Sequence, residues 1–203
     1  FSEIHSSDYE LEQAMRMAGN VYLPFVFELD YKAKRATPVA NAYTANSLEG
    51  FRELAKGTGH INVIPDSDGK FRRVPLFITY QDKMFPYLSF LVSCDFLGIR
   101  KTDVKLVPGR YLECGSYTAI PVDEQSNIIV NYAGAWGHSY KHYSYVDVLR
   151  SYIARLSGEQ PSIDLSVFKD KICMVGLSAA GTTDLHPSPF EPHYPSVGIH
   201  ADI

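Results

Sequence analysis

The stretch GHINVIPDSDGKFRRVPL, at residues 59–76, joins an apolar run to an acidic turn and a pair of arginines. Residues 60–64 favour an extended chain, and Pro65 ends it because proline fixes its own φ and restricts the residue before it. Residues 66–69 are Asp, Ser, Asp and Gly, which are typical of a tight turn. The stretch therefore predicts a strand, a turn and a returning strand over residues 74–80.

Arg72 and Arg73 stand at the start of the returning strand. Neighbouring side chains of a strand point to opposite faces, so at least one guanidinium group is expected to be partly covered. A covered guanidinium needs an acceptor, and Asp66 or Asp68 across the turn can provide it. The pattern favours a structural ion pair that fixes the hairpin, and the alternative is an arginine that anchors a ligand.

Three later segments accompany this stretch: NYAG at residues 131–134, KICMVGLSAAGTTDLHPSPF at 171–190, and PSVGIHADI at 195–203. Together the four motifs resemble the type-two CHASE domain, an extracytoplasmic sensory module of bacterial membrane receptors, over nearly the whole chain. Two positions depart from the family pattern. Ser188 stands where the family usually has Thr before Pro-Phe, and Asp202 stands at an Asn-like position.

The resemblance implies a place on the extracytoplasmic side of the cell membrane. It also implies a preceding membrane anchor, following transmembrane helices, and a cytoplasmic output such as a nucleotide cyclase, a histidine kinase or a GGDEF domain. The sequence begins without Met and stops where a helix is about to start, so we expect an excised fragment of such a receptor. We expect residues 1–203 to form a single sensory domain.

Composition agrees with a well-packed domain. A chain of 203 residues with 45% hydrophobic content can bury a sizeable core. A net charge of −4 without a basic stripe argues against a nucleic-acid partner. No apolar run approaches the roughly 18 residues that a membrane span requires.

Alternation of helical and extended patterns predicts the α/β class, an α/β sandwich whose mixed β-sheet is covered by helices. The expected helices begin at a capping box of Ser7 and Glu10, near Leu48, at Pro86 and after Ser144. The expected strands cover residues 21–27, 104–107, 120–122, 128–132 and 172–177. Residues 30–46 are expected to form a long loop.

Ser178 lies in a sequence that nearly matches a nucleophile elbow, with Asp184 and His186 close behind. An elbow must lead directly into a helix, whereas residues 181–195 are rich in Gly, Thr and Pro. Serine hydrolase chemistry is therefore only an alternative, and we predict no catalytic residue and no enzymatic activity in this fragment.

Metal and cofactor sites are not indicated. His138 and His142 lie four residues apart in a loop, without the supporting ligands that zinc requires. The acidic turn fails as a calcium loop because Lys70 takes a ligand position and no Glu closes it. Cys173 is expected to be buried, and Cys94 and Cys114 could form a disulfide, although an odd cysteine count weakens that pairing.

Ligands of open α/β sheets tend to lie beyond the carboxyl ends of strands. Three loops leave predicted strand ends, and their convergence would form a pocket for a small polar or anionic molecule. The candidate ligand-binding residues are Asn62, Arg72, Arg73, Asn131, Tyr132 and Asp184. The rings of Tyr132, Trp136, Tyr140, Tyr143 and Tyr145 crowd one of these loops and suit either a pocket, or packing and an interface.

These observations favour a non-catalytic sensor that binds a small molecule of unknown identity and acts as a homodimer through a population shift. A receptor dimerisation module without a small-molecule ligand is the first alternative, and it would show a large apolar interface. A hydrolase that uses Ser178 is the second. The sequence identifies neither the ligand, the output domain nor the sign of the signal.

Overall fold

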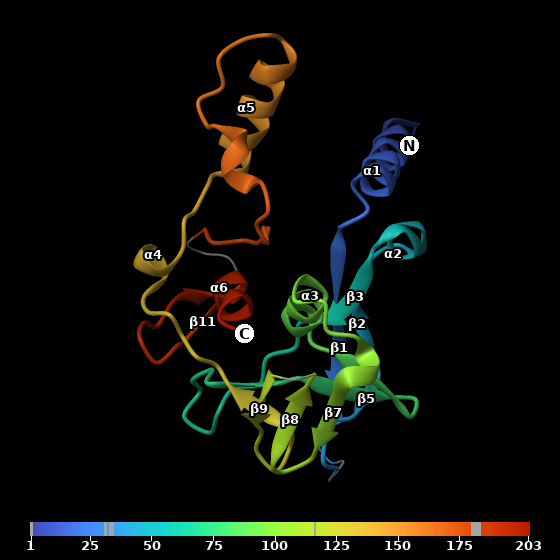
Figure 1. The fold of residues 1–203 in the computed structure, drawn as a ribbon, viewed down its shortest axis with the longest axis vertical. Coiled ribbons are helices and arrows are strands. Elements are labelled where there is room, and N and C mark those ends of the chain that lie inside the picture. The colour runs from blue at the N-terminus through green and yellow to red at the C-terminus, as the bar shows by residue number, and fades with distance from the viewer. Residues whose placement is uncertain (1, 31, 33–34, 116, 180–183) are drawn as a thin grey trace. The chain divides into compact units, whose positions relative to one another are not determined.

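The computed structural model describes residues 2–30, 32, 35–115, 117–179 and 184–203 (Figure 1). It divides into two compact units, Phe1–Asn131 together with Ile203, and Tyr132–Asp202, called here the first and the second unit. The combination of helices with parallel and antiparallel strands confirms the predicted α/β class. The assignment of all 203 residues to one domain stays a prediction.

The first unit contains, in chain order, α1 (Ser2–Ala18), β1 (Tyr22–Leu29), β2 (Ala40–Ala45), α2 (Glu49–Leu54), β3 (Gly57–His60), β4 (Arg73–Pro75), β5 (Phe77–Tyr80), β6 (Lys83–Pro86), α3 (Leu88–Phe96), η1 (Lys101–Asp103), β7 (Val104–Val107), β8 (Tyr111–Cys114), β9 (Tyr117–Pro121) and β10 (Asn127–Ile129). The second unit contains α4 (Trp136–Ser139), α5 (Tyr145–Leu156), η2 (Leu165–Phe168), β11 (Leu185–His186), β12 (Tyr194–Pro195) and α6 (Ser196–Ala201).

A mixed sheet of order β2-β1-β3 stands at the centre of the first unit. β1 runs antiparallel to β2 and parallel to β3. The remaining strands form smaller sheets, namely β10-β4, β5-β6, β7-β8-β9 and, in the second unit, β11-β12. The predicted mixed sheet is thus present, accompanied by several small antiparallel ones.

Aromatic side chains of β1 form the core of the first unit. Phe25 and Phe27 are buried beside Ile78, and their ring centroids lie 5.0 Å apart in an edge-to-face arrangement. Tyr80 and Phe85 pack against this cluster from β5 and β6. Full burial of one such side chain contributes about 1.5–3 kcal/mol, so β1 anchors the unit.

β3 passes so close to the start of α3 that only glycine fits at residue 59. A Cβ atom there would lie 2.6 Å from Cα and 2.8 Å from N of Leu88. Both are backbone atoms, which cannot move aside as the end of a flexible side chain can. The Gly of the GHIN motif is therefore explained by helix packing.

The predicted hairpin across the acidic turn is wrong, although the turn is present. Asp66 N donates to Lys70 O at 2.8 Å, and Gly69 has a positive φ of 79°. However, β3 pairs with β1 and β4 pairs with β10. β3 also ends at His60. Beyond it, the side-chain amide of Asn62 takes the place of a strand backbone beside Phe27. It accepts a hydrogen bond from Phe27 N at 2.9 Å and donates one to Phe27 O at 2.8 Å.

Other predicted boundaries also change. α1 begins at Ser2, upstream of the predicted Ser7 cap, and the predicted loop over residues 30–46 includes β2. Pro86 ends β6, so α3 starts only at Leu88. Ser144 is the N-cap residue of α5, as predicted, although its side chain makes no capping hydrogen bond.

Residues 172–177 form no strand. Among the described residues of the second unit, the only strands are β11 and β12, and these pair with each other. An extended segment without a neighbouring strand is not stable by itself. Cys173 is consequently exposed, contrary to the expectation of burial, whereas Cys94 and Cys114 are buried free thiols.

Candidate ligand-binding site

The two arginines of the first motif converge on one carboxylate. Arg72 Nη1 donates to Asp66 Oδ2 at 3.0 Å, and Arg73 Nη1 donates to Asp66 Oδ1 at 2.7 Å. Arg72 also forms two bonds of 2.9 and 2.8 Å with Asp68. The prediction that these guanidinium groups point to opposite faces is wrong, because Arg72 precedes β4 and its long side chain reaches back to the turn.

These contacts fix the charges of the turn. Hydrogen bonds from Arg72, with that from the Lys70 backbone, hold the pKa of Asp68 well below its usual range. The pKa of Arg72 is raised mainly by Asp68 and then by Asp66. The cluster is therefore the structural ion pair that the sequence favoured, and its guanidinium groups are already bonded to protein carboxylates.

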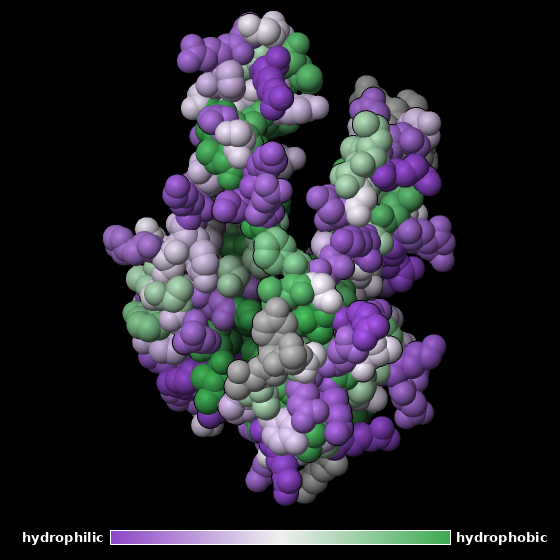
Figure 2. Space-filling view, viewed as in Figure 1, coloured by the Kyte–Doolittle hydropathy of each residue, from purple (hydrophilic) through white to green (hydrophobic). Residues whose placement is uncertain are grey.

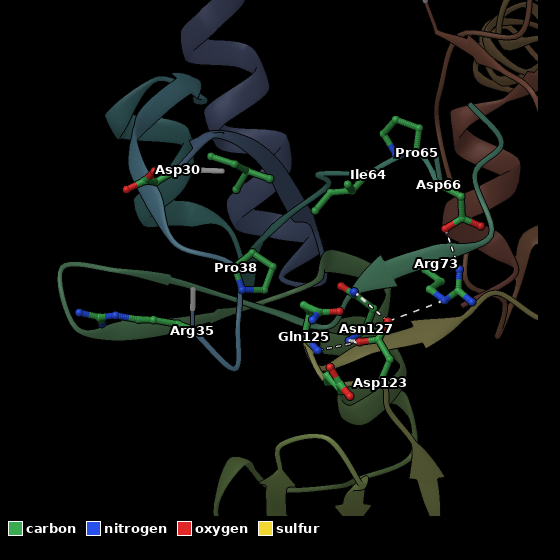
Figure 3. Close-up of a pocket in the computed structure, with 12 residues that line it drawn as sticks. Asp30, Arg35, Pro38, Ile64, Pro65, Asp66, Arg73, Asp123, Gln125 and Asn127 are labelled. Carbon is green, nitrogen blue, oxygen red and sulfur yellow. Dashed lines mark hydrogen bonds and ion pairs between the residues drawn. The ribbon is translucent and has the colours of Figure 1, made fainter. Parts of the chain in front are cut away.

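A cavity of about 570 Å³ lies beside this cluster in the first unit (Figure 3). Its polar lining residues are Asp30, Arg35, Asp66, Arg73, Asp123, Glu124, Gln125 and Asn127. Asp30 follows the carboxyl end of β1, where ligands of α/β sheets commonly bind. A volume of this size suits a small molecule.

A rigid turn before β10 forms one wall of the cavity. Asp123 Oδ1 accepts hydrogen bonds from the backbone N–H groups of Gln125 and Asn127 at 3.0 and 2.8 Å. Ser126 has a positive φ of 61°, and its hydroxyl donates to Ala36 O at 2.6 Å. Asp123 also lies 3.7 Å from Arg73 Nε, which links this wall to the arginine cluster, as Figure 3 shows.

Asn127 presents an acceptor that the described residues leave unused. Its Nδ2 donates to Asp123 Oδ2 at 3.1 Å, as it must, because an ionised carboxylate can only accept. The other end of the amide, Oδ1, is buried and has no hydrogen-bond partner within the described part of the chain. Because this atom is closed off from solvent, it is an unsatisfied group inside the wall and not a contact for a molecule in the cavity.

The six ligand-binding residues predicted from the sequence lie at different places in the structure. Arg73 lines the cavity, whereas Asn62 bonds the backbone of Phe27 and Arg72 bonds the acidic turn. Asn131 is the last residue of the first unit's main segment, and Tyr132 and Asp184 belong to the second unit. Convergence of all six on one pocket stays a prediction.

Asp202 organises the aromatic loop of the second unit. Its carboxylate accepts hydrogen bonds from the hydroxyls of Tyr140 and Tyr194 at 2.6 and 2.7 Å and from Ala133 N at 2.9 Å. Burial, and then the neighbouring Asp202, raise the pKa of both tyrosines. Trp136 stacks on His142 with ring centroids 3.9 Å apart. These rings pack the loop against α6.

The geometry around Ser178 does not support the serine hydrolase alternative. Residues 171–179 are irregular and Ser178 is exposed, so no strand leads into the serine; residues 180–183 of the motif lie outside the described residues. After them comes the short strand β11 at Leu185–His186. A search of the described residues finds no group of three or more His, Cys, Asp or Glu side chains that could hold a metal ion.

Sequence reasoning missed Asp30, Asp123, Glu124 and Asn127. The run Asp-Glu-Gln-Ser-Asn at residues 123–127 is typical of a turn in which an Asp side chain bonds the backbone, and that signal was available. The sequence did not indicate that this turn lies near Arg73, because that proximity depends on the pairing of β4 with β10.

A family model described as CHASE2 domain matches residues 1–203. No curated protein and no solved structure matches the chain. Of the helices in the described part of the chain, none combines the length and the apolar character needed to cross a bilayer.

Proposed function

The chain belongs to the CHASE2 family of extracytoplasmic, non-catalytic sensory domains, and on this basis we propose that it detects a small molecule in the cavity of the first unit. The observation that carries the proposal is the cavity of about 570 Å³ beyond the carboxyl end of β1. Ligands of α/β sheets commonly bind beyond the carboxyl ends of strands, and a volume of this size suits a small molecule.

In this proposal residues 1–203 act as one sensory domain of a larger membrane receptor. A ligand that binds one arrangement of the domain better than another shifts the population toward it. The shift passes through transmembrane helices to a cytoplasmic output of the same chain, such as a nucleotide cyclase, a histidine kinase or a GGDEF domain. Binding need only be stronger in one arrangement for the signal to pass.

Thermal unfolding with a metabolite library tests this proposal, because a compound that binds only the folded state raises the melting temperature. Ile64 lines the cavity, and Ile64→Trp should abolish any such rise by filling it. Ile129→Trp is the matched control, since Ile129 is exposed. A rise that survives Ile64→Trp, or no rise with any compound, would contradict the cavity as the sensing site.

A second candidate function, a homodimerisation module, is favoured by the surface of α5. Six large hydrophobic side chains of this helix are 45–70% exposed: Tyr145, Val146, Leu149, Tyr152, Ile153 and Leu156. At 100° per residue they form one stripe about 120° wide. In Figure 2, hydrophobic residues lie at the surface of this helix.

The opposite face of α5 is already used. Ser151 is buried there, and its hydroxyl bonds Ser162 Oγ at 3.0 Å and accepts from Ile163 N at 3.1 Å. The apolar stripe runs the whole length of α5, from Tyr145 to Leu156. A second copy of α5 packed antiparallel would cover it along its length, because a two-fold interface uses the same patch on both copies.

Sedimentation of the purified chain tests the dimer. Leu149→Lys should convert a concentration-dependent dimer into a monomer, whereas Leu48→Lys, which adds the same charge at another exposed leucine, should leave it unchanged. A wild-type chain that stays monomeric at high concentration would exclude this second function.

A further inference from the structure

We propose that Cys94 and Cys114 form an intramolecular disulfide when the chain meets a thiol–disulfide oxidant on the extracytoplasmic side of the membrane. The bond is a modification of the first unit that neither uses nor requires the cavity of the proposed function. It follows from where the two thiols lie, from the short connection between their elements and from the compartment.

Both cysteines belong to the buried side of their elements. Cys94 lies one helical turn after Phe90 in α3, and these two residues are buried on the same face of the helix. Cys114 ends β8 two positions after the fully buried Leu112, so both face the same side of the strand. Cys94 and Cys114 are only 8% and 4% exposed. Each thiol is therefore held inside the first unit.

A short connection brings the chain from the end of α3 back beside β8. Cys94 O accepts a hydrogen bond from Ile99 N at 2.7 Å, just beyond the last turn of the helix. The chain then enters β7, whose first residue, Val104, lies opposite Cys114 in the antiparallel register. Residues 99–104 are therefore the whole path between a residue bonded to Cys94 and a residue paired with Cys114.

The two thiols also act on each other electrostatically. Burial raises the pKa of Cys94 to about 11, and the charge of a Cys114 thiolate raises it as well. Burial likewise raises the pKa of Cys114. An electrostatic effect between two thiols of one unit indicates close neighbours, because Coulomb energy falls with distance. Both sulfurs are thus neutral thiols at pH 7 in the reduced form, which is the form that this structure holds.

The third cysteine lies apart from this pair. Cys173 belongs to the second unit and is exposed, whereas Cys94 and Cys114 are both buried in the first. The odd cysteine count weakened the pairing in the sequence, and the structure explains it by one solvent-exposed thiol.

The compartment supplies the oxidising conditions. CHASE2 domains lie outside the cytoplasm, where disulfides form and persist. The oxidant required is a disulfide R–S–S–R, either a small molecule or a protein. The thiolate of one cysteine attacks it and forms a mixed disulfide, with one R–S⁻ as the leaving group. The thiolate of the second cysteine then attacks the protein sulfur of the mixed disulfide and expels the other R–S⁻. The two cysteines are oxidised, the oxidant is reduced to two R–SH, and the two cysteine protons end on these products.

Burial sets the time at which the bond forms. A thiolate is the reactive species, and buried thiols with raised pKa values seldom supply it in the folded chain. The oxidant therefore reacts while the first unit is folding or when α3 opens. Once formed, the bond is buried, so a reductant in solution reaches it slowly for the same reason.

Oxidative refolding followed by peptide mapping tests the pairing. The chain is unfolded in urea with a reductant, refolded in a mixture of reduced and oxidised glutathione, treated with an alkylating reagent, and cleaved with trypsin without reduction. Arg100 and Arg110 lie between the two cysteines, so cleavage separates them unless a disulfide joins the fragments. We expect the fragment of residues 84–100 linked to that of residues 111–141, and Cys173 alkylated.

Thermal unfolding of Cys173→Ser shows whether the bond belongs to the native fold, because this variant keeps only the two buried thiols. For a closed loop of residues 94–114, the oxidised form should melt about 6–12 °C above the reduced form. Cys173→Ser combined with Cys114→Ser is the matched control, and it should melt at the same temperature in both redox buffers. The comparison of the two redox forms of Cys173→Ser does not depend on the folding of this control.

The outcomes decide the proposal. Alkylation of Cys94 and Cys114 after oxidative refolding would overturn it, as would a link from either one to Cys173. A linked pair without a rise in melting temperature would also contradict it, because a disulfide of the native fold stabilises that fold. None of these results bears on ligand binding in the cavity, so a failure of the disulfide leaves the proposed function untouched.

Discussion

Removing the hydroxyl of Tyr194 is expected to destabilise the second unit by an amount that the structure allows us to estimate. Tyr194 is fully buried, and its Oη donates to Asp202 Oδ2 at 2.7 Å. The same carboxylate accepts from Tyr140 at 2.6 Å on its other oxygen. Tyr194→Phe keeps the ring and its packing while deleting one hydrogen bond to a charged group.

Hydrogen bonds to charged groups contribute about 1.5–3 kcal/mol each. Asp202 keeps its bonds from Tyr140 and Ala133 after the substitution, so we expect a loss of about 2 kcal/mol, near the lower part of that range. For a chain of 203 residues, each kcal/mol lowers the melting temperature by about 2–4 °C. Tyr194→Phe should therefore lower it by about 4–8 °C.

Urea denaturation and thermal unfolding measure this effect. Tyr145→Phe is the matched control, because Tyr145 is 68% exposed and should tolerate the loss of its hydroxyl within about 0.5 kcal/mol. Equal stabilities of the two variants would refute the reasoning, since they would show that the bond to Asp202 adds nothing to folding.

Three further predictions concern single residues. Gly59→Ala should cost about 1–3 kcal/mol in urea denaturation, because the new Cβ would lie 2.6 Å from Leu88 Cα, and an unchanged midpoint would contradict that close approach. Burial lowers the pKa of His200 to about 4, so the unfolded chain binds more protons below its usual pKa of about 6.5. Stability should therefore fall as pH drops from about 6.5 to about 4, by at most about 3 kcal/mol, and His200→Gln should remove this slope; identical slopes in both proteins would count against it. A thiol reagent at pH 8 should label the exposed Cys173 in the native protein but not Cys94, whose pKa burial raises to about 11, and rapid native labelling of Cys94 would show that it is not buried.

Features that depend on neighbouring residues were predictable from the sequence. The limits of β7 at Val104–Val107 follow from an extended apolar run, and Ser144 marks the start of α5. Gly19 and Gly98 end helices with positive φ values of 62° and 69°, as glycine allows without strain. In each case the signal and the structure lie within a few residues.

Features that depend on distant pairing were not predictable. The residues of β3, Gly57–His60, do not specify the partner of the strand, so its parallel pairing with β1 was missed and a local hairpin was expected instead. The run at residues 172–177 shows the same limit, because an apolar pattern becomes a strand only when a neighbour completes its hydrogen bonds.

The residues of the candidate site show the same difference between local and distant signals. The ion pair between Asp66 and the arginines lies within a few residues of sequence and was predicted. The wall that contains Asp123 and Asn127 was not predicted, because only the antiparallel pairing of β10 with β4 brings it close to Arg73.

An NMR titration of the isotope-labelled chain with a compound that raises its melting temperature tests the central claim most directly, because it reports where a ligand binds. We predict saturable shifts of the backbone signals of Asp30, Asp66, Arg73 and residues 123–127, which line the cavity. Signals that move only in the aromatic loop at residues 132–145, or signals that do not move at all, would contradict a ligand site in the first unit.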